Sequence, residues 1–188
     1  MTLQAEFKTV LTSEGPLDVL DRVQRRVLWL AASQVHHANK VRSTRSGVKV
    51  GGHQASSASM VSIMSALYLS QLQATDRVSV KPHAAPVLHA INYLLGRLDR
   101  RYLTELRTFG GLQSYPSRSK DPDPVDFSTG SVGIGATATI WSALAHRYVA
   151  SHYDVPAGPA ALAALAPGAR RSPAPAPRRG GSPGGSGP

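Results

Sequence analysis

The sequence predicts an α/β fold that is rich in helix. At least five segments repeat apolar residues at intervals of three and four, which places these residues on one face of an α-helix. One short segment, residues 76–81, alternates apolar and polar residues as a half-buried strand does. The composition changes near residue 155, after which 24 of 33 residues are Ala, Pro or Gly. We therefore expect a folded region over residues 17–155, an N-terminal extension over residues 1–16 and a disordered tail over residues 156–188.

Two helices are expected in the first part of the chain. The first follows the turn-like pair Gly15-Pro16 and ends before Gly47, with apolar residues spaced for one buried face. The second is an almost wholly apolar run over residues 60–72, which predicts a buried helix. Residues 55–59, at its start, are small and mostly carry hydroxyl groups. These hydroxyls suit a plain N-cap and equally an anion site, and the sequence leaves both interpretations open.

A strand and a helix are expected to meet at His83. Residues 76–81 are followed by Pro82, which stops a strand, and a helical pattern then continues to Gly96. His83 would therefore lie at a strand-to-helix junction, where open α/β sheets expose functional groups.

The last elements are a helix, a loop and another helix. A helix is expected over residues 99–109, and the prolines of the following loop keep that loop out of helix and central strand. A glycine-rich segment over residues 128–136 then opens a long helix that reaches Val149. Such a segment can hold a cofactor or simply allow close helix packing.

Composition excludes several classes of protein. The chain has no cysteine, so it has no disulfide, no thiolate metal site and no cysteine nucleophile, and a cytoplasmic location is expected. No apolar stretch is long enough for a membrane span. Of the net charge of +10, four charges come from arginines in the expected tail. The rest of the chain has no basic run interleaved with aromatic residues, so nucleic-acid binding is not favoured.

Five motifs occur in an order that is specific in combination. They are Gly52-His53 with Ser56 and Ser59, Lys81-Pro82-His83-Ala84-Ala85-Pro86, Leu106-Arg107-Thr108-Phe109, Gly111-Leu112-Gln113-Ser114-Tyr115-Pro116, and the segment from Ser128 to Gly135. Together they resemble the N-terminal part of the thiamine-diphosphate-dependent transketolase superfamily, and most closely the homodimeric-type pyruvate dehydrogenase E1 component. The Gly-His-x-x-Ser form at Gly52 and the Leu-x-Ser-Tyr-Pro form at Leu112 point to that branch. The resemblance covers about residues 17–153.

The resemblance implies two histidines and a set of small residues as a site. It implies that His53 lines the active site near the thiazolium, that His83 contacts the diphosphate or the substrate, and that Ser56 holds a diphosphate oxygen. The aminopyrimidine would be met by the backbone of Gly130, Ser131 and Val132 and approached closely at Gly133 and Gly135. The alternative for each histidine is an ordinary, partly buried imidazole.

The remaining histidines have no such support. We expect His36, His37, His89, His146 and His152 to lie on helix surfaces.

The magnesium ligands implied by the resemblance are missing. In the superfamily they are an Asp in a Gly-Asp-Gly-like motif and a downstream Asn, both after the last expected helix. From Pro156 onward the chain has no Asp, Glu, Asn or Gln, so thiamine diphosphate and Mg²⁺ are implied while no metal ligand is assigned. We therefore expect an incomplete thiamine-diphosphate-binding domain.

Three functions remain open at this point. The first is a fragment of a thiamine-diphosphate-dependent enzyme that acts on a 2-oxo acid or ketose and is inactive as this chain alone, its full-length form being a homodimer. The second is a non-catalytic module that pairs with a related subunit. The third is a basic protein that binds anions or nucleic acid through Arg170, Arg171, Arg178 and Arg179.

The expected tail has the composition that a GC-rich gene yields in a wrong frame. We predict that one of the other two reading frames after codon 155 resumes with an apolar strand, a Gly-Asp pair followed by an acidic residue, and an Asn-containing loop. Sequencing the gene tests this. Stop codons or unpatterned sequence in both frames would instead favour a true short protein with a binding role.

Overall fold

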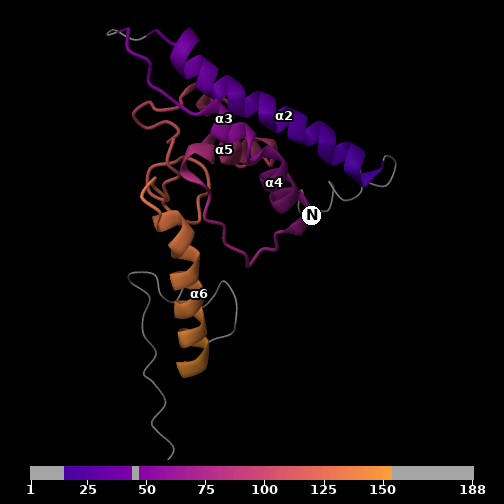
Figure 1. Ribbon diagram of the computed structural model, residues 1–188, viewed down its shortest axis with the longest axis vertical. Coiled ribbons are helices and arrows are strands. Elements are labelled where there is room, and N and C mark those ends of the chain that lie inside the picture. Colours follow the sequence, from indigo (N-terminus) through magenta and orange to yellow (C-terminus); the bar gives the residue numbers. More distant parts are fainter. Residues whose placement is uncertain (1–14, 44–46, 154–188) are drawn as a thin grey trace, which may run out of the picture. The chain divides into compact units, whose positions relative to one another are not determined.

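The computed structural model describes residues 15–43 and 47–153, which form two units divided after residue 142. Figure 1 shows that the first unit is built from helices joined by long loops. Short π-helical turns follow two of the helices, and 3₁₀ turns precede and follow α5. The α-helices are α2 (Pro16–His36), α3 (Gln54–Ala58), α4 (Val61–Ala66), α5 (Ala85–Leu94) and α6 (Ile134–His152), the last of which continues into the second unit.

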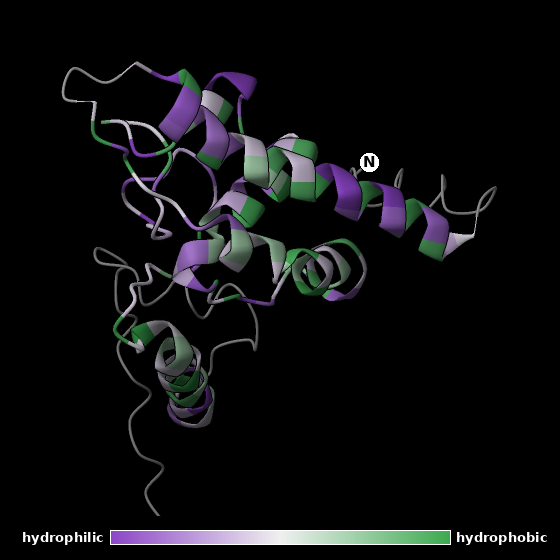
Figure 2. Cartoon of the chain, turned by 45° about the horizontal axis from the view of Figure 1, so that its top comes forward, coloured by the Kyte–Doolittle hydropathy of each residue, from purple (hydrophilic) through white to green (hydrophobic). Residues whose placement is uncertain are grey.

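Helix α2 is the longest element, and its sequence explains where it begins. Pro16 occupies the first turn, where its missing N–H costs nothing, and Asp18 places a negative charge near the positive end of the helix dipole. Hydrophobic and hydrophilic residues alternate around the helix (Figure 2). A π-helical turn, His37–Val41, carries the chain beyond the α-helix, so the predicted end before Gly47 is confirmed.

The core forms around α5, which is buried on nearly all sides. Residues 85–92 of α5 are all buried, and α2, α3 and α4 pack against this helix. Val27 and Ile91, both 0 % exposed, belong to the main cluster, and a second cluster contains Leu106 and Leu112. Because a helix that is apolar on every side must be covered on every side, α5 fixes the positions of the elements around it.

The predicted stop of α5 at Gly96 is confirmed. Gly96 has φ +70°, Arg97 N–H donates to the carbonyl of Asn92 at 2.8 Å, and Gly96 N–H donates to Tyr93 at 3.0 Å. A left-handed glycine with these two bonds closes a helix by satisfying its last carbonyl groups.

The predicted strand over residues 76–81 does not pair with another strand, so the α/β class is not confirmed. Side chains take the place of a neighbouring strand: Asp126 accepts from Val78 N–H at 2.9 Å, and Thr129 donates to the carbonyl of Val80 at 3.0 Å. The described residues contain one isolated parallel bridge, between Leu106 and Leu112, and no strand. The alternation of apolar and polar residues therefore indicated an extended segment, but a β-strand also needs a second strand to pair with.

Two other expectations are corrected. The run over residues 60–72 is not a single buried helix: it forms α4 and a π-helical turn, and Ile63 is 60 % exposed. The helix expected over residues 99–109 shortens to a 3₁₀ turn, Arg100–Thr104. Beyond it Arg107 has φ +60°, a left-handed conformation that ends the helical path so that Leu106 can pair with Leu112.

In the second unit the structure describes residues 143–153, the C-terminal half of α6 and one further residue. Tyr148 and His152 stack there with ring centroids 4.1 Å apart. The expected tail and all but the last two residues of the expected N-terminal extension lie outside the described residues. No helix among those that the structure describes is both long and apolar enough to cross a membrane.

Two isoleucines that differ in burial provide a test of the assigned core. Ile91→Ala should lower the free energy of unfolding by about 2–5 kcal/mol, because it removes a fully buried side chain and leaves a cavity. The matched change Ile63→Ala, on an exposed side chain, should alter it by less than about 0.5 kcal/mol. Urea unfolding followed by circular dichroism measures both, and equal losses would contradict the assigned core.

Candidate functional site

Two of the predicted site residues lie in direct contact. The rings of His53 and His83 have centroids 3.9 Å apart and are tilted by 35°, although 30 positions separate them in the sequence. Tyr115 lies next to His83, with centroids 5.3 Å apart. Three of the motifs that carry the resemblance thus contribute one ring each to a single cluster, which we call the His53–His83–Tyr115 cluster.

Asn39 holds the backbone that leads to His53. Its side-chain amide donates to the carbonyl of Gly51 at 2.8 Å and accepts from Gly51 N–H at 2.9 Å. The next residue, Gly52, has φ +130°, and a Cβ there would lie 2.8 Å from Val35 Cγ1. Only glycine fits this position without a shift in α2, so the approach of His53 to its partners depends on a backbone that passes tightly against α2.

Arg107 connects two sides of the cluster. Its guanidinium donates to the carbonyl of Val50 and its Nε–H donates to the hydroxyl of Ser114. Val50 precedes the glycines that lead to His53, and Ser114 precedes Tyr115. One side chain therefore holds both chain segments beside His83.

The environment of His83 favours its neutral form. Loss of hydration lowers its pKa below the ordinary value, and the nearby His53, Arg107 and Lys81 lower it further. Its Nδ1 is buried and has no hydrogen-bond partner within the described residues. A neutral imidazole with a free nitrogen can accept or donate a proton near neutral pH, which is the requirement for acid–base work at a carbonyl group.

Ser56 was predicted as a site residue, but the next residue, Ser57, is the one that contacts His83. Ser57 is 1 % exposed and its hydroxyl donates to the carbonyl of His83 at 3.1 Å, which holds α3 against the start of α5. Ser56 is partly buried, and its own carbonyl accepts from the Ser59 hydroxyl at 2.9 Å.

The predicted glycine-rich segment lies against the chain that leads to His83. Ser79 donates to the carbonyl of Gly135 at 2.6 Å, and Thr129 bonds to Val80 as described above. Gly133 has φ +86°, and α6 begins at the next residue. Gly130 is partly buried, while Ser131, Val132 and Gly133 are exposed.

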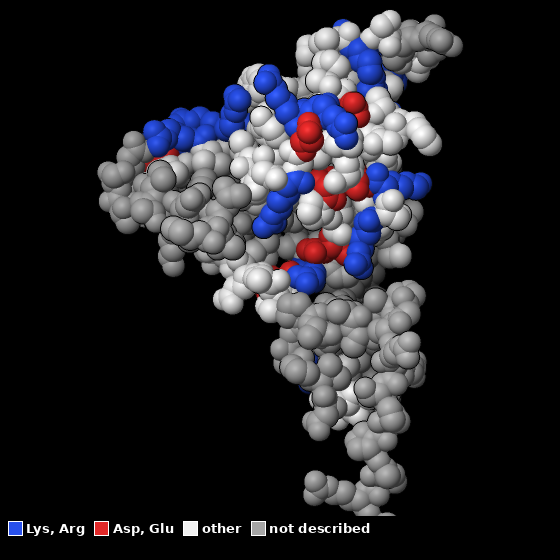
Figure 3. Space-filling model, turned by 180° about the vertical axis from the view of Figure 1, so that it is seen from behind, with Lys and Arg blue, Asp and Glu red and all other residues white. Residues whose placement is uncertain are grey.

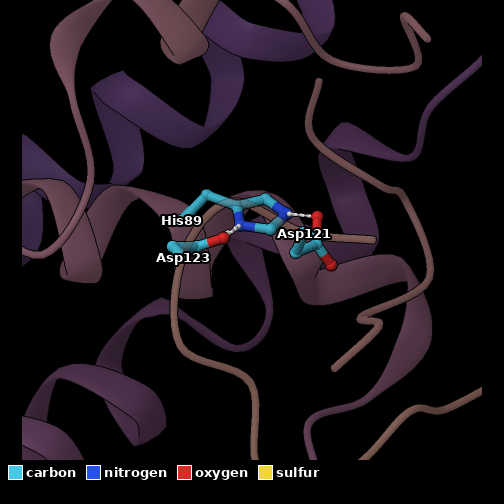
Figure 4. Close-up of side chains that lie close together, drawn as sticks. All are labelled: His89, Asp121 and Asp123. Carbon is cyan, nitrogen blue, oxygen red and sulfur yellow. Dashed lines mark hydrogen bonds and ion pairs between the residues drawn. The ribbon is translucent and has the colours of Figure 1, made fainter. Parts of the chain in front are cut away.

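A buried polar cluster was missed by the sequence analysis. His89 is 0 % exposed, so its expected place on a helix surface is wrong. Its Nδ1 lies 2.9 Å from Asp123 Oδ2, and its Nε2 lies 3.0 Å from the carbonyl of Gln113 and 3.8 Å from Asp121 Oδ1 (Figure 4). Asn92 donates to Asp123 at 2.7 Å. This cluster attaches the loop after Gln113 to α5.

Protonation of His89 is favoured within this cluster. Burial alone would lower its pKa, but the hydrogen bond and charge of Asp123, the charge of Asp121 and the Gln113 carbonyl outweigh it, so the pKa is raised. Burial likewise raises the pKa of Asp121, against the opposing effect of His89. The three side chains are of metal-ligating types with ligand atoms within 4.8 Å of one another. Each ring nitrogen nevertheless faces a different oxygen, which suits an imidazolium held from both sides.

Some of these residues carried a signal in the sequence. His89 belongs to a mostly apolar helix, in which Asn92 is the other buried polar residue, and a helix that is apolar around most of its circumference is buried. Tyr115 was part of a motif. Arg107 was also part of a motif, although the motif did not indicate that its side chain binds the Val50 carbonyl. Asn39 gave no signal, because it binds a backbone group that is distant in the sequence.

Comparisons with known proteins find pyruvate dehydrogenase E1 components. The chain is 33 % identical over 146 residues to the pyruvate dehydrogenase E1 component of Mycobacterium tuberculosis, a match that covers 72 % of this chain. It is 31 % identical over 153 residues to the same component of Cupriavidus necator, covering 77 % of the chain, and 28 % identical over 144 residues to that of Escherichia coli, covering 72 %. The chain is a relative of pyruvate dehydrogenase E1 components.

The predicted resemblance is thereby confirmed, over a limited part of the E1 component. The matches cover 15 %, 16 % and 16 % of the length of these three relatives. No family model matches the chain, and no solved structure matches it.

The pKa of His83 tests the geometry of the cluster. It should lie below the ordinary histidine value and should rise toward that value in His53→Gln, because the change removes a neighbouring ring that can carry positive charge and exposes His83 to water. NMR titration of the imidazole signals measures this shift. The control His36→Gln, on the surface at the end of α2, should leave the pKa of His83 unchanged.

The His89 cluster predicts a stability that depends on pH. A histidine whose folded-state pKa is raised stabilises the fold fully below its unfolded-state pKa of about 6.5, and this contribution is lost as the pH rises through the folded-state value. His89→Gln should therefore cost about 3–5 kcal/mol at pH 6, since it breaks a buried pair, and less at pH 9. A loss that does not vary with pH, as expected for His36→Gln, would contradict a protonated His89.

Proposed function

We propose that this chain supplies part of a thiamine diphosphate site in an enzyme of the pyruvate dehydrogenase E1 or transketolase type, which acts on a 2-oxo acid or ketose. The observation that carries the proposal is the contact of His53 with His83, 3.9 Å between ring centroids, in a chain whose relatives are E1 components. Two histidines from separate motifs lie together, and the surroundings of His83 favour its neutral form. Such an arrangement is typical of a functional site.

The proposal gives each predicted site residue a role. His83 would hold or release a proton at the substrate carbonyl through its free Nδ1, and His53 would orient the substrate beside it. Ser56 would bind a diphosphate oxygen. The backbone of Gly130, Ser131 and Val132 would meet the aminopyrimidine, with close approach at Gly133 and Gly135.

The residues present fit the cofactor in part. Thiamine diphosphate, when bound, supplies the carbon nucleophile that attacks the carbonyl. The orphaned Nδ1 of His83 and the basic Arg107 and Lys81 nearby suit a polar, anionic group. Mg²⁺ requires oxygen ligands, and the only described carboxylates in a metal-ligating group, Asp121 and Asp123, already bind His89 and backbone groups. We assign no metal ligand, and cofactor binding by this chain should be weak.

A non-catalytic interaction module is the second candidate. Helix α6 exposes large apolar side chains along its length, which is typical of a surface that binds another protein. These are Ile134, Ile140, Trp141, Leu144 and Tyr148, each more than half exposed. The partner would be a related subunit or a second copy of the chain.

The nucleic-acid alternative gains little support. On the face shown in Figure 3, basic side chains over the centre are interspersed with acidic ones. The four tail arginines named above lie outside the described residues.

Cofactor titration tests the proposed function. Thiamine diphosphate with Mg²⁺ should shift the imidazole NMR signals of His53 and His83 only at high concentration, and His83→Ala should abolish the response of His53. His36→Ala is the matched control and should respond as the unaltered chain does.

The outcomes distinguish the two parts of the claim. Tight, magnesium-dependent binding would contradict the expected weakness and would indicate a metal site built from Asp121, Asp123 or another carboxylate. Absence of any response at saturating cofactor would contradict the placement of the site and favour the interaction module.

A further inference from the structure

A cavity of about 400 Å³ lies at a place that the proposed function does not use. Its walls come from α2, the end of α5 and the 3₁₀ turn Arg100–Thr104. None of the residues proposed for the thiamine diphosphate site lines it. The volume is within the range of about 300–1,000 Å³ typical of small-molecule sites.

Two residues that line this cavity each have a buried polar atom without a partner within the part of the chain that the structure describes. These atoms are Oε1 of Gln34 and Nδ1 of His37. Gln34 is 1 % exposed, and its amide nitrogen donates to the carbonyl of Pro86 at 3.0 Å. That bond fixes which end of the amide is the oxygen, because only the nitrogen can donate to a carbonyl. An unpartnered acceptor in such a position is costly unless a ligand or water donates to it.

The charge around the cavity has one sign. Arg26 and Arg100 line it, no Asp or Glu does, and neither arginine forms a salt bridge among the residues described. Guanidinium groups without a carboxylate partner suit phosphate and carboxylate ligands, which they can bind through two parallel hydrogen bonds.

An aromatic surface borders the same cavity. Trp29 lines it while remaining 57 % exposed, and Tyr93 lies on the wall contributed by α5. The guanidinium carbon of Arg26 lies 4.8 Å from the centroid of the Trp29 ring, which holds the exposed indole in place. An indole held in this way is available to contact a flat ring.

We propose that this cavity binds a small aromatic anion of the chemical class of a nucleoside monophosphate. Its phosphate would pair with Arg100 and Arg26, and its base would contact Trp29. Each group of the ligand answers one observed feature: the positive charge and the exposed ring.

Titration with AMP on the full 188-residue chain tests the proposal. The variant Trp141→Phe leaves Trp29 as the single tryptophan, so its indole N–H signal in an NMR spectrum reports on the cavity alone. AMP should shift this signal saturably. Arg100→Ala should weaken binding about tenfold or more, because it removes a charge-assisted contact to the phosphate. Arg118→Ala is the matched control, an exposed arginine that does not line the cavity.

Two further ligands separate the parts of the proposed recognition. Adenosine, which lacks the phosphate, should bind about tenfold more weakly than AMP, and inorganic phosphate should leave the Trp29 signal in place. No saturable shift with AMP would overturn the proposal. So would equal binding of adenosine and AMP, or equal effects of Arg100→Ala and Arg118→Ala.

Discussion

The burial of α5 on nearly all sides is the constraint on which the first unit depends. A helix without a solvent face must be covered by other elements, and every polar group on it must find a partner inside the protein. Helix α2 meets both requirements, since its apolar face covers α5 while Gln34 donates to the Pro86 carbonyl. The loop that contains Asp123 meets the second requirement for His89 and Asn92. These hydrogen bonds hold the loop that contains Asp121-Pro122-Asp123-Pro124 in one position against α5.

The candidate site is a by-product of the same arrangement. His83 lies in the 3₁₀ turn Pro82–Ala84 just before α5, so its position follows from the position of that helix. His53 reaches it because Asn39 and Arg107 hold the backbone that leads to His53 through its carbonyl and amide groups. These contacts depend on polar side chains from elements far apart in the sequence. The geometry of the cluster is therefore set by the tertiary fold and would not survive in the isolated segments.

Local patterns and ordered motifs were sufficient for some features and insufficient for others. The extent of α2, the stop at Gly96 and the start of α6 followed from helical periodicity and from glycine and proline signals. The motifs identified the relatives and brought forward His53 and His83. The extended segment over residues 76–81 was predicted as a strand because alternation describes a chain and carries no information about its neighbours. His89 was misplaced because an amphipathic residue type was judged without regard to the apolar helix around it.

Arg107 combines two demands that no other residue meets together. Its backbone adopts φ +60°, which costs a residue with a Cβ about 1 kcal/mol or more, while its side chain must span from Val50 to Ser114. Glycine would relieve the backbone and lose both contacts, asparagine would tolerate the backbone but is too short, and lysine lacks a second nitrogen to donate in a different direction. In a saturation library, almost every substitution at position 107 should therefore be unfavourable. Substitutions that stabilise this part of the fold should be found among the neighbouring residues instead.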